Sequence, residues 1–299
     1  MDIKKFEKIC KMSQPNLKDY AIKQLAYTHK TVMQDDGFVY AKGSLPILLV
    51  AHMDTVHKEL PHTIMYNSKI QSMSSPNGIG GDDRCGIYMV LEVVKKFNCS
   101  VLFTEDEEVG GVGAEKFAKT NLAKELKFNY MIEFDRQGSN DAVFYDCDNP
   151  EFEAFITREF YKSTWGSFSD ISVIAPVIGC AAVNLSCGYY KAHTKDEYVI
   201  LPEMEKSIEA ACAILERTTE TDKFEYIEAE RSYYSEWESY YNEEPRYYSI
   251  EYVTKKGKSK FYDVEAFSTA EAVGKFCMEN PDRTYGDIVD IYYFDDYAY

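Results

Sequence analysis

The stretch ILLVAHMDT (47–55) decides the fold of this chain, because a short apolar run ends in a histidine and an aspartate. A continuous apolar run of this length is typical of a strand that is buried on both faces of a parallel sheet. His52 and Asp54 follow directly, where the strands of open α/β sheets end and where such sheets place their sites. The stretch therefore predicts a buried parallel strand with potential metal ligands at its carboxyl end.

Four further segments carry acidic residues or a histidine, and most of these residues follow a short apolar run or adjoin a glycine-rich turn. They are GIGGDDRCG (78–86) with Asp82 and Asp83, FTEDEEVGG (103–111) with Glu107 and Glu108, MIEFDRQG (131–138) with Asp135, and YYKAHTKDEY (189–198) with His193. Imidazole nitrogen and carboxylate oxygen are ligands of zinc and similar ions. Together with 47–55, these segments predict a two-metal hydrolase.

Hydrophobic periodicity predicts an α/β fold for the first two-thirds of the chain. Helices are expected within 3–29, directly after Asp82-Asp83, from Pro150 to Tyr161, after the glycines at 110–111, and at 201–218. Strands are expected at 100–108, 129–135 and 180–186, and a hairpin at 63–73. Alternating strands and helices imply a mostly parallel mixed sheet with helices on both faces.

A shift in composition after residue 217 predicts a separate C-terminal part. Residues 218–299 are more acidic than the preceding region and hold 14 of the 25 tyrosines. We expect a catalytic domain at 1–217, a linker or packing helix at 218–245, and a small α+β module with ββαβ order at 246–299.

Charge and composition exclude several classes of protein. A net charge of −17 argues against binding to nucleic acid and to anionic membrane surfaces. The sequence contains no apolar run long enough to cross a bilayer. Its first residues, MDIKKFEKICKMS, lack an apolar core and a small-residue cleavage site, so we expect no secretory signal. Its eight cysteines are scattered without a CxxC pair, which is typical of reduced thiols, and we therefore expect a cytoplasmic protein.

The residue types match the needs of a site that holds two divalent ions. Such a site requires about two histidines, a carboxylate that bridges the ions, two terminal carboxylates and a separate general base. In the adjacent pair Glu107-Glu108, one carboxylate can bind metal while the other takes a proton from water. Asp54 is spaced to orient the ring of His52. The remaining histidines His29, His57 and His62 are expected to be structural.

These motifs, AHMDT, GGDDRCGI, FTEDEEVG, EFDR and AHTKDEYV, resemble those of the co-catalytic zinc exopeptidases in the same order. Within that clan they are most similar to peptidase T (tripeptidase) and to the leucyl and deblocking aminopeptidases. The similarity covers residues 40–217. It implies a zinc aminopeptidase/carboxypeptidase-like fold and two divalent ions, zinc first, with cobalt or manganese as alternatives.

The resemblance also implies a role for each matching residue. The implied ligands are His52, Asp82, Glu108, Asp135 and His193. The Asp82 carboxylate would bridge both ions, and the peptide bond between Asp82 and Asp83 is expected to be cis. Glu107 would be the general base, and Asp54 would support His52. Whether Glu108 binds the same ion as His193 stays open.

The sequence departs from many relatives between Asp135 and His193. These residues are too close in sequence for the lid or dimerisation domain that many relatives insert there. Any oligomer would therefore form without such a domain, and a group that stabilises the oxyanion must come from elsewhere. Tyr161, Tyr189 and Tyr190 are the candidates, and Asp170 is a candidate for contact with a substrate amine or for a helix cap.

Three functions remain open from the sequence. The first is a metal-dependent exopeptidase that cleaves the terminal amide of short peptides with a two-metal-activated water, as an aminopeptidase or a di- or tripeptidase. The second is a related metallohydrolase that deacylates N-acyl amino acids or another non-peptide amide. The third is an inactive binding module, which is disfavoured because every expected ligand and the base are present.

Overall fold

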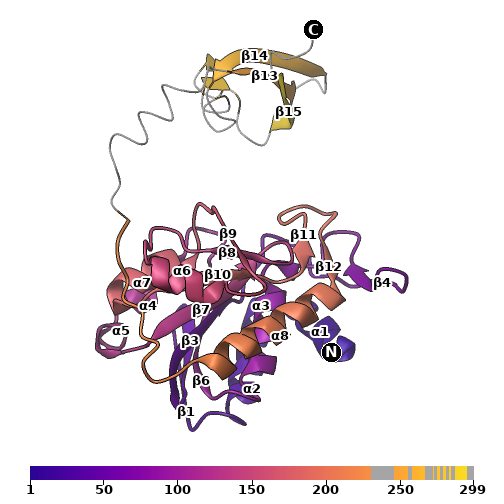
Figure 1. Ribbon diagram of the computed structural model, residues 1–299. Coiled ribbons are helices and arrows are strands. Elements are labelled where there is room, and N and C mark those ends of the chain that lie inside the picture. Colours follow the sequence, from indigo (N-terminus) through magenta and orange to yellow (C-terminus); the bar gives the residue numbers. More distant parts are fainter. Residues whose placement is uncertain are drawn as a thin grey trace. The chain divides into compact units, whose positions relative to one another are not determined.

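The computed structural model divides the chain into two compact units, Met1–Ala229 and Glu230–Tyr299, which are described separately (Figure 1). It describes residues 1–229, 246–254, 258–266 and 287–294, together with residues 272, 275, 276, 279, 280 and 283. Among these residues, no helix has both the length and the apolar character needed to cross a membrane.

An eight-stranded mixed sheet forms the centre of the first unit. In order across the sheet, its strands are β1 (Thr31–Asp35), β2 (Phe38–Lys42), β6 (Cys99–Thr104), β3 (Leu45–His52), β7 (Tyr130–Arg136), β10 (Ala182–Ser186), β8 (Asp141–Val143) and β9 (Lys162–Thr164). The four central strands β6, β3, β7 and β10 are parallel, whereas β1, β2 and β8 join by antiparallel pairing. The predicted fold class is therefore confirmed.

Strand β3 shows why the sheet is covered on both faces. Ile47 and Leu49 belong to one hydrophobic core, whereas the alternating Leu48 and Val50 belong to the other. Successive side chains of a strand point to opposite faces, so a continuous apolar run needs a helical layer on each side.

Two helical layers supply this cover. One contains α1 (Ile3–Cys10), α2 (Gln14–Leu25), α3 (Gly81–Val93) and α8 (Leu201–Arg217), and the other contains α4 (Val112–Ala118), α5 (Asn121–Glu125) and α7 (Asp170–Ile178). Helix α6 (Pro150–Ile156) packs Phe152 and Ile156 into the core of the first layer. Figure 1 shows α3 and α8 on the same side of β3 and β7.

A smaller antiparallel sheet lies at the carboxyl end of the central strands. Its order is β11 (Tyr189–Tyr190), β12 (Tyr198–Ile200), β5 (Ser72–Ser74) and β4 (Met65–Asn67). β4 and β5 form the hairpin that was predicted at 63–73. Because β11 and β12 flank His193 in the sequence, this sheet holds both ends of the loop that carries His193.

Among the elements that differ from the sequence prediction are two helices. Helix α7 was not predicted, because Pro176 within it reads as a helix breaker. The proline is tolerated two residues before the helix ends at Ile178, and Gly179 then adopts the left-handed conformation that closes many helices. Helix α6 begins at Pro150 as predicted but ends at Ile156, five residues before Tyr161.

The C-terminal unit contains a three-stranded antiparallel sheet in the order β14 (Ser259–Ala266), β13 (Arg246–Val253) and β15 (Ile288–Phe294). Tyr248 and Ile250 of its central strand are buried with Phe276. The helix expected between β14 and β15 lies largely outside the described residues. Of the segment 218–245, residues 218–229 are described and belong to the first unit, in which bridges join Glu225 to Cys180 and Glu228 to Cys147.

Gly86 allows α3 to pack closely on β7, and its replacement by Ala should destabilise the first unit. An added Cβ would lie 1.9 Å from the carbonyl oxygen of Phe134 and 2.3 Å from Oδ2 of Asp83. Gly86→Ala should lower the free energy of unfolding by about 3 kcal/mol or more, because backbone cannot yield as a flexible side chain can. Urea denaturation followed by far-ultraviolet circular dichroism measures the loss.

Gly179→Ala is the control for this substitution. Gly179 has a φ of 79° and no atom within 4 Å of an added Cβ, so only the backbone conformation opposes the change. Its cost should be about 1–2 kcal/mol. An equal or smaller loss for Gly86→Ala would show that α3 is not seated on β7 as described.

Candidate active site and metal centre

The carboxyl ends of the central strands bring the predicted ligands together. His52 is the last residue of β3, Asp135 lies near the end of β7, and Asp82 is at the start of α3. Glu108 follows β6, and His193 follows β11. These side chains form two groups. Within each group, the potential ligand atoms all lie within 4.8 Å of one another.

The first group consists of His52, Asp82 and Asp135. His52 Nε2 lies 3.1 Å from Oδ1 of Asp82 and 3.3 Å from Oδ1 of Asp135. The imidazole of His52 is fully buried, and both carboxylates are almost fully buried. Three converging donor atoms of these types form one half of a candidate two-metal site.

The second group consists of Asp82, Glu108 and His193. His193 Nε2 lies 3.2 Å from Oδ2 of Asp82 and 3.0 Å from Oε2 of Glu108. Asp82 therefore turns one carboxylate oxygen to each group, as a bridging ligand must. The structure also groups Glu108 with His193, a pairing that the sequence left open, and the peptide bond between Asp82 and Asp83 is cis.

Asp54 connects the two halves of the site through hydrogen bonds. Its Oδ1 lies 3.1 Å from Nδ1 of His52 and accepts the backbone N–H of Glu107 at 3.0 Å. Its Oδ2 accepts the backbone N–H of Glu108, also at 3.0 Å. A donor at Nδ1 leaves the Nε2 lone pair of His52 facing Asp82 and Asp135, which is the orientation that metal binding requires.

Glu107 stands beside the two groups without belonging to either. Its Oε2 is 3.9 Å from Nε2 of His52. Burial raises the pKa of Glu107 to about 8, and the charges of Asp135, Asp170 and Glu108 act in the same direction. A carboxyl group outside the ligand set, yet within reach of the same centre, fits the part of a general base.

The carboxylates of the cluster repel one another in a buried setting. Burial, together with the charge of Asp82, raises the pKa of Asp135 to about 7. Burial alone would also raise the pKa of Asp82, but its hydrogen bonds to His193 and His52 lower it below its ordinary value. Hydrogen bonds to Asp82 and Glu108, together with the charges of these two carboxylates, raise the pKa of His193 to about 10.

The mutual repulsion of these carboxylates means that the two groups of potential ligands fit divalent cations. Several carboxylates so close together cannot all be ionised without positive charge among them. Two histidines supply part of that charge, and Oε1 of Glu108 is buried without a hydrogen-bond partner. An orphaned oxygen on a carboxylate whose other oxygen lies 3.0 Å from the His193 imidazole suits zinc or a similar borderline ion.

A second layer of buried polar groups lies behind Asp135. The hydroxyl of Ser169 donates to Oε2 of Glu133 and lies 3.2 Å from Oδ2 of Asp135. Asn184 accepts the backbone N–H of Asp135 at 2.9 Å and donates to the hydroxyl of Tyr145 at the same distance. These contacts hold the end of β7 from the side of α7. Ser169 precedes the predicted Asp170 in the segment FSDIS, whereas no motif in the sequence pointed to Glu133, Asn184 or Tyr145.

The predicted substrate-contacting residues divide into two pairs. Tyr189 and Asp170 lie beside the cluster: the Tyr189 hydroxyl donates to the Asp135 carbonyl at 3.1 Å, and Asp170 is a fully buried first residue of α7 that accepts a hydrogen bond from Thr104. In contrast, the Tyr161 hydroxyl donates to the carbonyl of Ser207 in α8.

Tyr190 likewise contacts α8 rather than the cluster. Its hydroxyl donates to Glu203, and its ring stacks on Tyr198. The structure therefore does not bring Tyr161 and Tyr190 to the metal groups, and their expected role near an oxyanion finds no support in their contacts.

Two of the three other histidines are engaged elsewhere in the fold. His29 is buried and bonds through Nε2 to the carbonyl of Cys99 at 2.7 Å, as expected of a structural histidine. His57 instead lies 2.9 Å from Oε2 of the buried Glu197. The sequence did not single out Glu197, although it follows His193 by four positions in the same motif.

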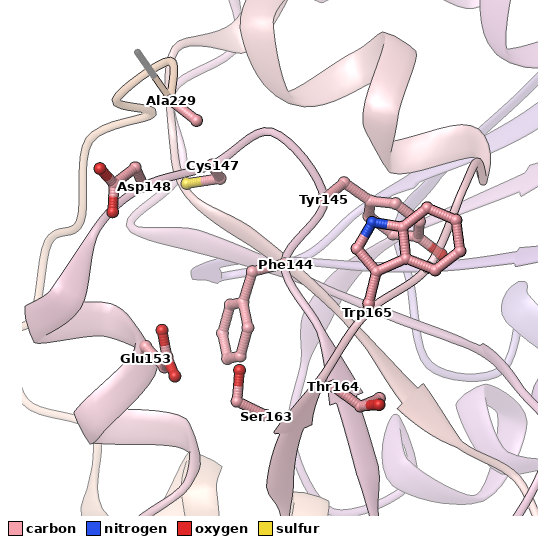
Figure 2. A pocket seen from close by; sticks show the side chains of 10 residues that line it. Phe144, Tyr145, Cys147, Asp148, Glu153, Ser163, Thr164, Trp165 and Ala229 are labelled. Carbon is pink, nitrogen blue, oxygen red and sulfur yellow. The ribbon is translucent and has the colours of Figure 1, made fainter. Parts of the chain in front are cut away.

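A surface hollow near the site is lined by aromatic and acidic side chains, among them Tyr145, Trp165 and Glu153 (Figure 2). Trp165 is 80% exposed there. Tyr145 links the hollow to the cluster, because Asn184 joins its hydroxyl to the backbone of Asp135. The hollow therefore borders the polar layer behind Asp135.

Comparison with known proteins agrees with this geometry. Residues 39–165 match Peptidase family M28. The matched range contains His52, Asp82, Glu107, Glu108 and Asp135 and ends before His193. No curated protein matches the sequence significantly.

Solved structures share the fold at low sequence identity. Aminopeptidase PepT from Bacillus cereus has a TM-score of 0.60 and 15% identity, over 72% of this chain and 97% of that one. A tripeptidase from Staphylococcus aureus has a TM-score of 0.55 and 12% identity, over 70% and 95% of the two chains. An aminopeptidase from the archaeon Desulfurococcus kamchatkensis has a TM-score of 0.56 and 17% identity, over 73% and 95%.

These findings confirm the resemblance to the co-catalytic exopeptidases that the motifs indicated. The structural matches establish the shared α/β fold. The M28 match covers most of the residues that form the two groups. Fold and site together support a metal-dependent exopeptidase.

Removal of one imidazole should empty one of the two metal positions. We expect wild-type protein to bind two equivalents of Zn²⁺ or Co²⁺ per chain, because Asp82 faces both groups. His193→Ala should retain one equivalent, since the group around His52 stays complete. Elemental analysis after dialysis measures the stoichiometry, and His62→Ala, which removes an exposed histidine, is the control. Two tightly bound equivalents in His193→Ala would rule out His193 as a ligand.

Proposed function

We propose that this protein is an aminopeptidase or a di- or tripeptidase that releases the terminal residue of short peptides. The observation that carries the proposal is the division of the Asp82 carboxylate between two histidine-containing groups, with Glu107 beside them. Zinc is the metal that this donor set favours, with cobalt or manganese as alternatives. Bound divalent ions would polarise the scissile carbonyl and lower the pKa of water.

Glu107 is assigned the proton transfers. Asp54 holds the backbone at Glu107 beside the site, because it accepts the backbone N–H groups of both Glu107 and Glu108. Glu107 would take a proton from the attacking water at Oε2 and deliver it to the leaving amine. Both transfers are general acid–base steps that a carboxyl group of raised pKa performs well near neutral pH.

The acidic surroundings favour a substrate with a free amino group. In the part of the chain that the structure describes, the recorded ion pairs of Asp82, Glu108 and Asp135 are with His52 and His193. Arg84 follows the bridging carboxylate by two positions but is buried and donates to the carbonyls of Met53 and Met12. The Arg84 guanidinium is therefore directed at backbone carbonyls, while carboxylates make up most of the two candidate metal groups, which suits an ammonium group.

Apolar side chains beside the acidic cluster offer surface for a substrate side chain. Val109 follows Glu108 directly and is 73% exposed. Phe168 is 44% exposed, and its ring lies 2.7 Å from the point that a Cβ on Gly111 would occupy. This surface is consistent with peptides as substrates. The cytoplasmic location and the oligomeric state stay predictions from the sequence.

The choice between peptidase and deacylase can be tested with paired substrates. We expect the protein loaded with Zn²⁺ or Co²⁺ to cleave a tripeptide with a free N-terminus at least tenfold faster than its N-acetylated form, measured as kcat/KM by release of new amino groups. The reverse preference would favour the deacylase. No turnover of either substrate by protein with two bound ions would refute both assignments.

Glu107→Gln should abolish most of the activity while metal remains bound. Loss of a general base typically costs a factor of about 10²–10⁴ in rate. We expect kcat to fall by that range with two metal equivalents retained, as measured by steady-state kinetics and elemental analysis. Asp106→Asn is the control, because Asp106 is adjacent and outside both groups. Activity that survives in Glu107→Gln would show that another residue is the base.

A further inference from the structure

Glu197 is a fully buried carboxylate that bonds to the loop carrying Asp82. Its Oε1 accepts the backbone N–H of Asp82 at 3.0 Å. Its Oε2 accepts the backbone N–H of Gly80 at 2.7 Å and lies 2.9 Å from Nε2 of His57. Both oxygens are therefore engaged at the start of α3, although 115 positions separate Glu197 from Asp82 in the sequence.

His57 supports the same loop from its other side. A Cβ added to Gly78 would lie 2.1 Å from Cε1 of the His57 ring, so the ring lies directly against this glycine. Gly81 likewise lies against Glu197, because a Cβ added to Gly81 would lie 3.4 Å from Oε1 of Glu197. The glycines of GIGG (78–81) thus permit the close approach that lets Glu197 and His57 enclose the loop.

Glu197 also belongs to the loop that carries His193. The backbone N–H of Thr194 donates to the carbonyl of Lys191 at 3.3 Å, and that of Glu197 donates to the carbonyl of Thr194 at 3.2 Å. These two successive turns join His193 to Glu197. The His193 side chain itself is 55% exposed, so packing alone holds it weakly.

The position of Glu197 couples two ligands of one metal group. Asp82 and His193 approach within 3.2 Å through Oδ2 and Nε2, yet they come from separate loops. Glu197 bonds directly to the backbone of the first loop and closes a turn of the second. A side chain that spans both loops sets the distance between the ligands they carry.

We propose that Glu197, oriented by His57, is a positioning residue that holds Asp82 at the correct distance from His193 for a second divalent ion. The inference rests on the proposed two-metal function and extends it to residues outside the ligand set. Glu197 acts through the backbone and does not touch the ion.

Metal titration of the full chain tests this inference without reference to activity. Glu197→Gln replaces one accepting oxygen by an NH₂ group. This NH₂ group faces a backbone N–H that the oxygen accepted and cannot accept a hydrogen bond from it. We expect the dissociation constant of the weaker Co²⁺ equivalent to rise by roughly 10- to 100-fold. The tighter equivalent should change less than about threefold, and the visible spectrum of the weaker Co²⁺ ion should shift.

Two variants accompany the measurement. Asp196→Asn removes one charge at the neighbouring exposed position and should leave both dissociation constants unchanged. His57→Ala keeps both N–H bonds to Glu197 and should weaken the same equivalent by a smaller factor. His57→Ala also tests the inference if Glu197→Gln does not fold.

The outcomes separate this inference from the proposed function. A metal-free Tm that falls in Glu197→Gln or His57→Ala, with unchanged dissociation constants and an unchanged Co²⁺ spectrum, would assign these residues a purely structural part and overturn the inference alone. Wild-type protein that binds no second ion would overturn both the inference and the two-metal function.

Discussion

The approach of one carboxylate to two imidazoles is the interaction on which the rest of this site depends. Asp82 turns Oδ1 to His52 at 3.1 Å and Oδ2 to His193 at 3.2 Å. These three side chains come from the end of a central strand, the start of a helix and a loop outside the main sheet. The α/β architecture brings them together because parallel strands place all their carboxyl ends at one edge.

This arrangement concentrates negative charge where water is scarce, and the fold must offset the resulting repulsion. At the centre, the imidazoles of His52 and His193, whose pKa values are raised, offset this repulsion. At Asp54, two backbone N–H groups donate hydrogen bonds to the carboxylate. The buried guanidinium of Arg84 adds a positive charge near Asp54 and Asp83, although it bonds to carbonyl groups. Divalent ions bound by the same carboxylates would complete this compensation, so metal binding and stability of the site are linked.

Local sequence patterns predicted the central strands well and the helices less evenly. The run before His52 is apolar at every position, and β3 is indeed covered on both faces. Helix α7 escaped prediction because Pro176 obscured it, whereas tertiary packing of Ile171 and Ile174 favours the helix. The β1–β2 hairpin was also missed, since β1 is largely exposed at the sheet edge and lacks a strong pattern.

The sequence by itself determined the residue types of the candidate ligands and their positions after strands, because both depend on residue chemistry and on short-range periodicity. Only the tertiary structure decided that Glu108 joins His193 while Asp135 joins His52. It also showed that the hydroxyl groups of Tyr161 and Tyr190 bond to α8 and that Glu197 bonds to the backbone of Asp82. Such pairings arise from contacts between loops far apart in the chain, and no local pattern of side chains encodes the distance between two loops.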